Sequence, residues 1–252
     1  MKPAPANPDR NVAVFLHSNG SVTIDKPDAL FEFNYVPHSR EHDLVYWNLP
    51  LLIGWDRYFY VMSVTARAFL TPHPSVLAMI RRIWTELGGS YVFVHIRRGD
   101  KARESDLVNI TRYTEVLQAK CNGSATVFVM SDGFRSHEEI SLALAGDYHI
   151  VSYRVLMKRW GLYAAKEEST GHYQEKFDVL PEVQRRALAF ELVASMYIGA
   201  MADFAVCTYS SNICRLIALF RGGKMNNNGV YSVDWPKWAV VVSNSLINIP
   251  DA

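Results

Sequence analysis

An unusual group of charged side chains follows directly after an apolar segment of the chain. Arg97, Arg98, Asp100 and Lys101 come after residues 91–96, with a single glycine among them. The planar guanidinium of arginine matches phosphate oxygens through paired N–H groups, and lysine adds a compact positive charge. Three cations beside one carboxylate therefore predict a site for an anion, with a phosphate as the natural ligand.

Two simpler interpretations of the same residues stay open at this point. The first is a solvated basic end of a strand, because surface loops are often charged. The second treats Arg98-Gly99-Asp100 as an adhesion tripeptide, which requires an exposed loop. A short motif match has a high rate of chance occurrence, so the surrounding elements must decide.

The apolar segment before these charges predicts a strand that is buried on both faces. Residues 91–94 and Ile96 are aromatic or β-branched and show no polar alternation. Such strands belong to α/β sheets with helices on both sides. Ligands of open α/β sheets bind beyond the carboxyl ends of the strands, which is where the charged group lies. His95 lies within this strand, either as a core histidine or as a group presented to a nucleobase.

Two further strand ends carry polar residues. Asp132 follows the apolar residues 126–130, and Ser210 and Ser211 follow residues 203–207 and precede a helix. Because parallel strands end at one edge of a sheet, all three ends are expected to lie together. Either serine can cap the helix, whose N–H groups favour a phosphate. Asp132 is expected to orient an arginine, bind a ribose hydroxyl or start a turn.

The order of the predicted elements indicates an α/β fold. Strands alternate with helices between residues 90 and 220, which predicts a Rossmann-like parallel sheet. Residues 154–180 are predicted to form an irregular loop, and Ser75 is predicted to cap a helix. The predicted strands are 12–16, 91–96, 126–130, 148–153, 203–207 and 239–242, and the predicted helices are 61–70, 75–87, 111–121, 136–145, 181–201 and 212–220.

Composition places the chain among ordinary globular proteins. The 252 residues are 49% hydrophobic and carry a net charge of +1, so no broad field attracts nucleic acid. Neither a signal-peptide core nor an apolar run of about 18 residues occurs, which predicts a cytoplasmic protein without a membrane span. Sequons begin at Asn19, Asn109 and Asn122, and without a secretory signal we expect them to be chance matches.

Motifs of several common enzyme classes are missing from the sequence. It has no phosphate-binding glycine loop, no Gly-x-Gly-x-x-Gly, no zinc-ligand spacing and no Ser–His–Asp signature.

Three segments together resemble a known enzyme family. Residues 95–101, His-Ile-Arg-Arg-Gly-Asp-Lys, resemble the His-Val-Arg-Arg-Thr-Asp-Lys motif of α1,6-fucosyltransferases, which nodulation and protein O-fucosyltransferases share in similar form. Residues 202–215 resemble the second motif of that family, and residues 67–74 its preceding helix and Pro-x-Pro turn. The likeness covers roughly residues 60–220, with the motifs in the family's order.

The resemblance implies a GT-B-like glycosyltransferase that is inverting and needs no metal or other cofactor. Its substrates would be a nucleotide-diphosphate sugar and a glycan hydroxyl. Residues 61–252 would form the Rossmann-like donor domain, and residues 1–60 a reduced acceptor-side region. Cys207 and Cys214 match a disulfide of the family, although a reducing compartment would keep them as thiols.

The family's site residues carry over to particular positions of this chain. Arg97 and Arg98 would hold the donor pyrophosphate, and Asp100 and Lys101 would shape the phosphate and catalytic pocket. Because adjacent strand residues face opposite ways, Arg98 is expected to be the main ligand of the diphosphate, with Arg97 as a residue that braces the loop. Tyr113, Asp132 and Ser211 match further donor-site positions of the family. His95, Ser195 and Ser210 complete the candidate donor-binding residues.

Two departures from the family pattern bear on the base and on the donor. The family's glutamate base lies four residues after the motif lysine, whereas Glu104 lies three after Lys101; Asp106 is the second candidate. The position at which the family has its guanine-reading carboxylate corresponds to Ser195 here. Glu191, one helical turn earlier, could take its place. The resemblance implies GDP-fucose as the donor, and the serine makes a UDP sugar such as UDP-xylose the alternative. A non-catalytic nucleotide- or glycan-binding relative is the third hypothesis.

Overall fold

A computed structural model describes most of the chain between residues 55 and 234. The described residues are 13–16, 22–25, 55–99, 107–121, 125–162, 172–223 and 228–234. Asp100, Lys101, Glu104, Asp106 and the predicted strand at 239–242 lie outside the described residues.

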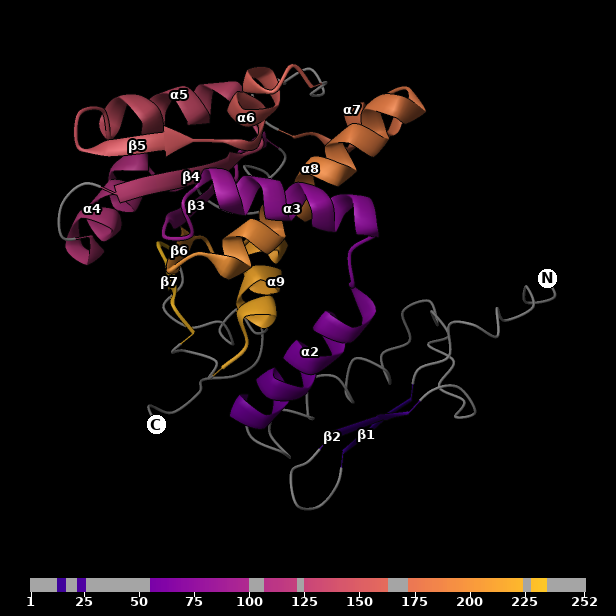
Figure 1. The fold of residues 1–252 in the computed structure, drawn as a ribbon. Helices are drawn as coiled ribbons and strands as arrows, with labels where there is room; N and C mark the ends of the chain where they lie inside the picture. Colours follow the sequence, from indigo (N-terminus) through magenta and orange to yellow (C-terminus); the bar gives the residue numbers. More distant parts are fainter. Residues whose placement is uncertain are drawn as a thin grey trace.

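Five parallel strands form the central sheet (Figure 1). They are β3 (Val92–Ile96), β4 (Ala125–Ser131), β5 (Tyr148–Val151), β6 (Phe204–Cys207) and β7 (Val230–Ser232), in the spatial order β5-β4-β3-β6-β7. Numbered along the chain, this is the 3-2-1-4-5 order found in Rossmann folds. The predicted α/β fold with a parallel sheet is confirmed. The strand order reverses between β3 and β6, the place where such sheets bind ligands.

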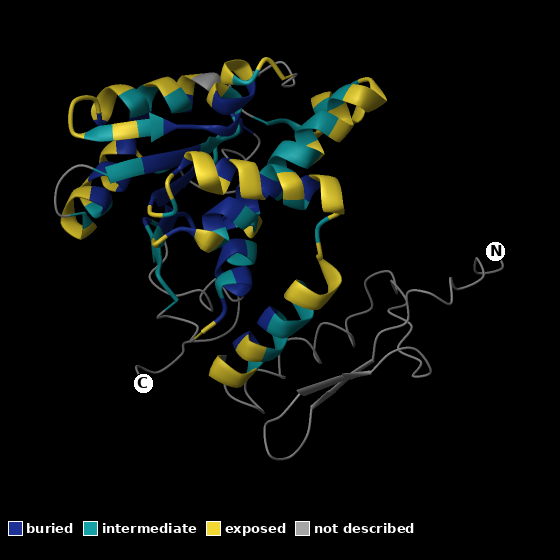
Figure 2. Ribbon diagram, viewed as in Figure 1, coloured by how far each residue is buried: buried dark blue, intermediate teal, exposed yellow. Residues whose placement is uncertain are grey.

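Helices cover both faces of this sheet, so it is buried between two layers (Figure 2). One face packs against α3 (Pro74–Glu86), α6 (Tyr153–Arg159), α8 (Glu182–Met201) and α9 (Asn212–Arg221); the other packs against α4 (Ile110–Lys120) and α5 (Phe134–Ala143). Strand β3 packs against both helical layers, because Phe93 points to the first face and Val92 and Val94 point to the second. This double burial explains its lack of polar alternation.

Helix α8 lies unusually close to β3. A Cβ added at Gly199 would lie 2.9 Å from the ring of Phe93, so no larger residue fits there without a shift. Phe93 in turn stacks on Phe128 of β4, with ring centroids 6.1 Å apart. Because β3 and α8 both reach the carboxyl edge of the sheet, this close packing fixes the relative position of the groups they present there.

Helix α2 (Trp55–Phe69) packs against α9, through Phe59 and the Ser63 hydroxyl, which donates to Leu219 O at 2.5 Å. Residue 60 therefore lies inside α2, and the division into regions 1–60 and 61–252 stays a prediction. Strands β1 (Ala13–Leu16) and β2 (Val22–Asp25) pair antiparallel with each other. Within the described ranges, no helix combines the length and the apolar character that crossing a membrane requires.

Several local features differ from the sequence-based predictions. The N-cap of α3 is His73, whose Nδ1 accepts a hydrogen bond from Ser75 N. Pro74 occupies the first helical position, where its lack of an N–H leaves no donor unsatisfied. Ser75 is therefore not the cap. The segment predicted as an irregular loop contains α6 and α7 (Gln174–Asp178), which are only seven and five residues long and too short for a clear apolar period. Strands β2 and β7, with four and three residues, were not predicted either.

Candidate functional site

A cleft of about 720 Å³ opens at the carboxyl edge of the sheet. The ends of β3 and β4 form its floor, the turn after β6 and the start of α9 form one wall, and α6, α7 and α8 form the other. The predicted meeting of the three strand ends is thus confirmed. Of the predicted site residues, the cleft brings together His95, Arg97, Asp132, Ser210 and Ser211; its other polar and charged lining residues are Ser131, Arg154, His172, Gln174, Gln184, Glu191, Asn212 and Arg215.

Asp132 ties the end of β3 to the segment before α7. The backbone N–H of Arg98 donates to both its carboxylate oxygens, at 2.9 and 3.1 Å, and the N–H of His172 donates at 3.4 Å. Arg97 completes the group with an ion pair of 3.4 Å. Of the roles expected for Asp132, the structure shows the orientation of an arginine. Burial raises the pKa of this carboxyl, against the opposing effects of Arg97 and the N–H donors.

The backbone after β3 packs so closely against His172 that only a glycine fits at position 99. Its φ is +50°, and an added Cβ would lie 2.1 Å from the backbone oxygen of His172. Gly99 is accordingly buried, and the Arg98 side chain is only 18% exposed. The adhesion interpretation, which needs an exposed Arg-Gly-Asp loop, is not supported by this packing.

The two adjacent arginines point to different places. Arg97 lines the cleft, whereas the guanidinium of Arg98 lies 3.8 Å from Glu139 of α5 and is not among the lining groups. This divergence follows from the alternation of side chains at the end of an extended strand. Arg97, and not Arg98 as expected from the sequence, is therefore the better placed of the two to contact a ligand in the cleft.

The turn between β6 and α9 presents the start of a helix to the cleft. Ser211 is the N-cap of α9, but its side chain makes no capping hydrogen bond, and Ser210, Ser211 and Asn212 all line the cleft. Arg215, one turn into the helix, donates from Nε to Tyr209 O at 2.7 Å and also lines the cleft. The partial positive charge of a helix start and the guanidinium of Arg215 both favour an anion here.

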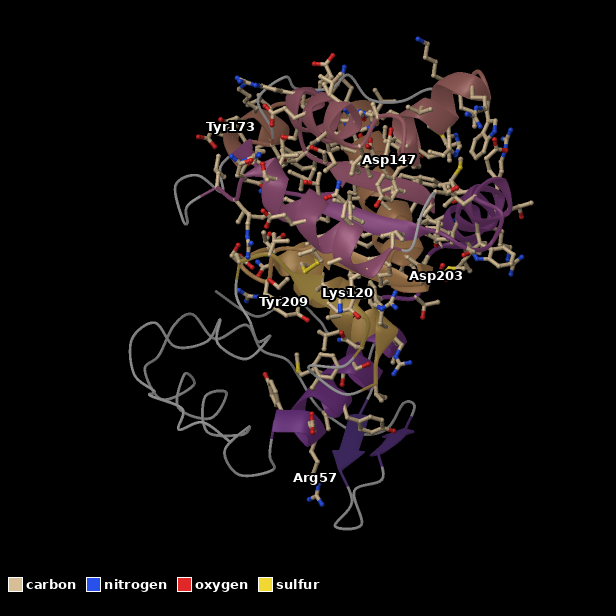
Figure 3. All side chains as sticks on the ribbon, turned by 90° about the vertical axis from the view of Figure 1, so that its left-hand side faces the viewer. Arg57, Lys120, Asp147, Tyr173, Asp203 and Tyr209 are labelled. Atoms are coloured by element: carbon tan, nitrogen blue, oxygen red, sulfur yellow. A yellow bond between two sulfur atoms is a disulfide. The ribbon has the colours of Figure 1, made fainter. Side chains whose placement is uncertain are left out.

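A disulfide joins Cys207, the last residue of β6, to Cys214 in the first turn of α9. Figure 3 shows it as a yellow bond close to the labelled Tyr209. Both sulfur-bearing residues are fully buried. The crosslink closes the short loop that carries Ser210 and Ser211 and so restricts its movement. The pairing implied by the family resemblance is confirmed.

Asp234 holds the same turn from the side of β7, and sequence reasoning missed it. Its carboxylate accepts from Tyr209 N at 2.8 Å, from Ser210 N at 3.1 Å and from the Ser232 hydroxyl at 2.6 Å. These two amides are therefore occupied, and the helix start itself remains the anion-facing part of the turn. In the sequence, only the polar Ser232 and Asp234 after Val230-Tyr231 indicated the end of a strand there.

Arg154 and Glu191 form an ion pair of 3.1 Å in the cleft, and the two side chains are 20% and 16% exposed. They also border a smaller cavity of about 170 Å³, which Ser195 lines. Ser195 is 1% exposed and is not among the residues lining the larger cleft. Glu191 is thus the α8 carboxylate that reaches the cleft. Arg154 was missed because it lies in the segment predicted as a loop.

His95 and Tyr113 are both buried below the rim. Among the described residues, His95 Nδ1 has no hydrogen-bond partner, although the residue lines the cleft. Burial, aided by the charge of Arg97, lowers the pKa of His95 to about 3, so the ring is neutral at pH 7. Tyr113, a residue of α4, packs in the core, with its hydroxyl hydrogen-bonded to the Thr208 side chain and its pKa raised by burial. It does not line the cleft.

Acid should destabilise the wild type more than a His95→Gln variant. The unfolded histidine binds a proton below about pH 6.5 and the folded one only near pH 3, so stability falls as pH drops through this window. We expect the difference between the two proteins to change by about 1.4 kcal/mol per pH unit there. Urea unfolding at several pH values measures it, and parallel curves would mean that His95 titrates normally.

Loss of the Asp234 carboxylate should loosen the turn at the start of α9. Asp234→Ala removes the acceptor for two backbone N–H groups, and we expect the free energy of unfolding to fall by about 1.5–3 kcal/mol. Asp234→Asn keeps one acceptor oxygen and should lose less. Denaturant titration of both variants provides the measurement. Equal stability of the alanine variant and the wild type would show that the turn does not depend on this carboxylate.

Comparison with known proteins leaves the family open. Among the described residues, no group of three or more His, Cys, Asp or Glu side chains is arranged to hold a metal ion. No protein-family model matches this chain, and no curated protein matches it. What is established is an α/β chain whose parallel sheet carries an arginine-lined cleft at the reversal of strand order.

Proposed function

We propose that this chain is an inverting glycosyltransferase of GT-B type that works without a metal ion. It would transfer a sugar from a nucleotide-diphosphate donor to a glycan hydroxyl. The observation that carries the proposal is the cleft itself: Arg97, Arg215 and the start of α9 converge at the reversal of strand order. Sheets of this kind bind nucleotides at such a place, and these groups suit a diphosphate.

The proposed chemistry assigns the cationic groups to the leaving diphosphate. When the bond between sugar C1 and phosphate oxygen breaks, negative charge grows on the diphosphate. Preorganised guanidinium groups and helix N–H groups stabilise such charge. The acceptor hydroxyl attacks C1 from the opposite side, which inverts the configuration, and a carboxylate takes its proton. Glu104 is the proposed base and Asp106 the alternative; both lie outside the described residues.

The donor base is the part of the proposal that depends on α8. Guanine offers two adjacent N–H donors, which a carboxylate accepts well, and leaving each unpaired costs about 1–3 kcal/mol. Ser195 offers no carboxylate and lies off the cleft, whereas Glu191 reaches it. GDP-fucose therefore remains the first donor we propose, with Glu191 as the reader of guanine. Because Arg154 already engages Glu191, a UDP sugar such as UDP-xylose is the second.

A transfer assay with both donors tests the proposal. Purified protein is incubated with GDP-fucose or UDP-xylose and a panel of glycan acceptors, with and without excess chelator, and the products are detected by mass spectrometry. We expect transfer from one donor, unchanged by chelator. Activity abolished by chelator and restored by Mg²⁺ or Mn²⁺ would refute metal independence. Nucleotide binding without transfer or donor hydrolysis would instead identify a non-catalytic relative.

A further inference from the structure

Asn109 lies at the surface within an Asn-x-Thr sequence. It is the exposed N-cap of α4 and stands in the sequence Asn109-Ile110-Thr111, of which Thr111 is also exposed. Asn109 Oδ1 accepts from both Thr111 N and the Thr111 hydroxyl, each at 3.0 Å. The carboxamide and the hydroxyl of the sequon are therefore already in contact.

The oxygen and the nitrogen of the Asn109 carboxamide differ in their hydrogen bonding. Oδ1 is engaged by the helix, while Nδ2 makes no hydrogen bond to any described residue. N-linked glycans are attached at Nδ2, so a glycan here would leave the cap intact. We propose that Asn109 carries an N-linked glycan, although the sequence alone gave reason to treat all three sequons as chance matches.

The disulfide is an independent observation in favour of this modification. Cys207 and Cys214 are both fully buried and joined. Structural disulfides form and persist in oxidising compartments, which include the lumen where N-glycans are added, and are rare in the cytosol. The cytoplasmic location predicted from the sequence remains untested, and the disulfide favours passage through an oxidising compartment.

The glycan would come from a lipid-pyrophosphate-linked oligosaccharide, and the cell's oligosaccharyltransferase would catalyse its transfer. Asn109 Nδ2 attacks C1 of the first sugar, the bond between C1 and the pyrophosphate oxygen breaks, and a C1–N bond forms. Nδ2 loses one proton to the transferase, and the lipid pyrophosphate leaves. Asn109 Oδ1 takes no part in the bond and stays hydrogen-bonded to Thr111.

The position of Asn109 is compatible with the proposed cleft. Asn109 does not line it, and no residue of its sequon does. Helix α4 follows β3 and returns along the face formed by Val92 and Val94, so its first residue lies toward the carboxyl edge of the sheet. The glycan would stand on this edge, outside the packed core. The modification is independent of the proposed glycosyltransferase activity, so either can fail alone.

Glycosidase labelling of the protein from the cells that make it tests the inference. The immunopurified full chain is treated with peptide-N-glycosidase F in heavy-oxygen water, which converts a glycosylated asparagine into ¹⁸O-labelled aspartate. We expect the peptide that contains Asn109 to carry this label. A tagged Asn109→Asp variant made in the same cells should lose one glycan mass and keep the fold, because aspartate also caps helices.

Thr111→Ser serves as a second variant, since serine keeps the sequon and a hydroxyl near Asn109; it should retain the glycan, at equal or lower occupancy. An unlabelled Asn109 peptide from the wild-type protein would overturn the inference. Free thiols at Cys207 and Cys214, trapped in the freshly lysed cells, together with an unlabelled peptide would place the chain in a reducing compartment and overturn the inference.

Discussion

Replacement of Glu104 by glutamine is expected to lower the turnover number by about 10²–10⁴ and to leave nucleotide binding nearly unchanged. The glutamine keeps the shape of the side chain but cannot accept the proton of the attacking hydroxyl. The loss should therefore appear in the chemical step and not in the affinity for the donor. Steady-state kinetics with the active donor, together with calorimetric titration of the nucleoside diphosphate, separates the two quantities.

The connection of Glu104 to the site rests on the ends of its segment. Residues 100–106 lie between Gly99, which is packed against His172 at the carboxyl edge, and Val108, which packs with the core beside α4. The described Gly99 lies at the carboxyl edge of the sheet, beside the cleft-lining His172, and Glu104 is five positions further along the chain. This closeness in sequence, together with the family resemblance, is the reason for proposing Glu104 as the base.

Asp106→Asn is the matched control, because Asp106 lies two residues further along the same segment and is also a carboxylate. It should retain most of the turnover if Glu104 is the base. Should Asp106→Asn lose turnover while Glu104→Gln keeps it, the roles of the two residues are exchanged. Full activity of both variants would mean that the base lies elsewhere.

The sheet and its binding edge could be predicted because the strands carry a strong signal. Residues 204–207 are apolar and, apart from His95, so are residues 91–96; a segment that is apolar on both faces fits a strand between two helical layers. Parallel pairing then brings Arg97, Asp132 and Ser211 to one edge without any knowledge of contacts. The general position of the site follows from these facts.

The wall of the site opposite the sheet could not be predicted, since it comes from weak local patterns. Helix α7 has five residues and Asp234 follows a strand of three, too few for a period to show. Arg154 lies in a helix of seven residues that directly follows β5. Its pairing with Glu191, 37 positions away, depends on how α6 packs beside α8.

The direction of each arginine also depends on tertiary structure. The motif contains two adjacent arginines, and alternation predicts that they diverge. From the sequence, Arg98 was the one expected to hold the diphosphate. Which one enters the cleft is decided by Asp132, which binds the Arg98 backbone and the Arg97 side chain at the same time. The Arg98 guanidinium is left on the α5 side near Glu139.

This placement gives the second large expected effect: Arg97→Ala should weaken binding of the nucleoside diphosphate by roughly 10- to 100-fold. A charge-assisted hydrogen bond contributes about 1.5–3 kcal/mol, and each 1.4 kcal/mol corresponds to a factor of ten in affinity. Arg97→Lys keeps the charge but loses the planar fork, so its affinity should be intermediate. Isothermal titration calorimetry with GDP and UDP measures all three proteins.

Arg98→Ala is the control that the neighbouring position offers. Its guanidinium pairs with Glu139, which is 40% exposed, and such pairs contribute about 0–1 kcal/mol. We therefore expect affinity to change by no more than a few fold, provided that circular dichroism shows the variant folded. The family resemblance assigns the pyrophosphate to both arginines. A loss confined to Arg98→Ala would show that Arg98 swings away from Glu139 to bind the ligand, and that Arg97 serves only to hold Asp132.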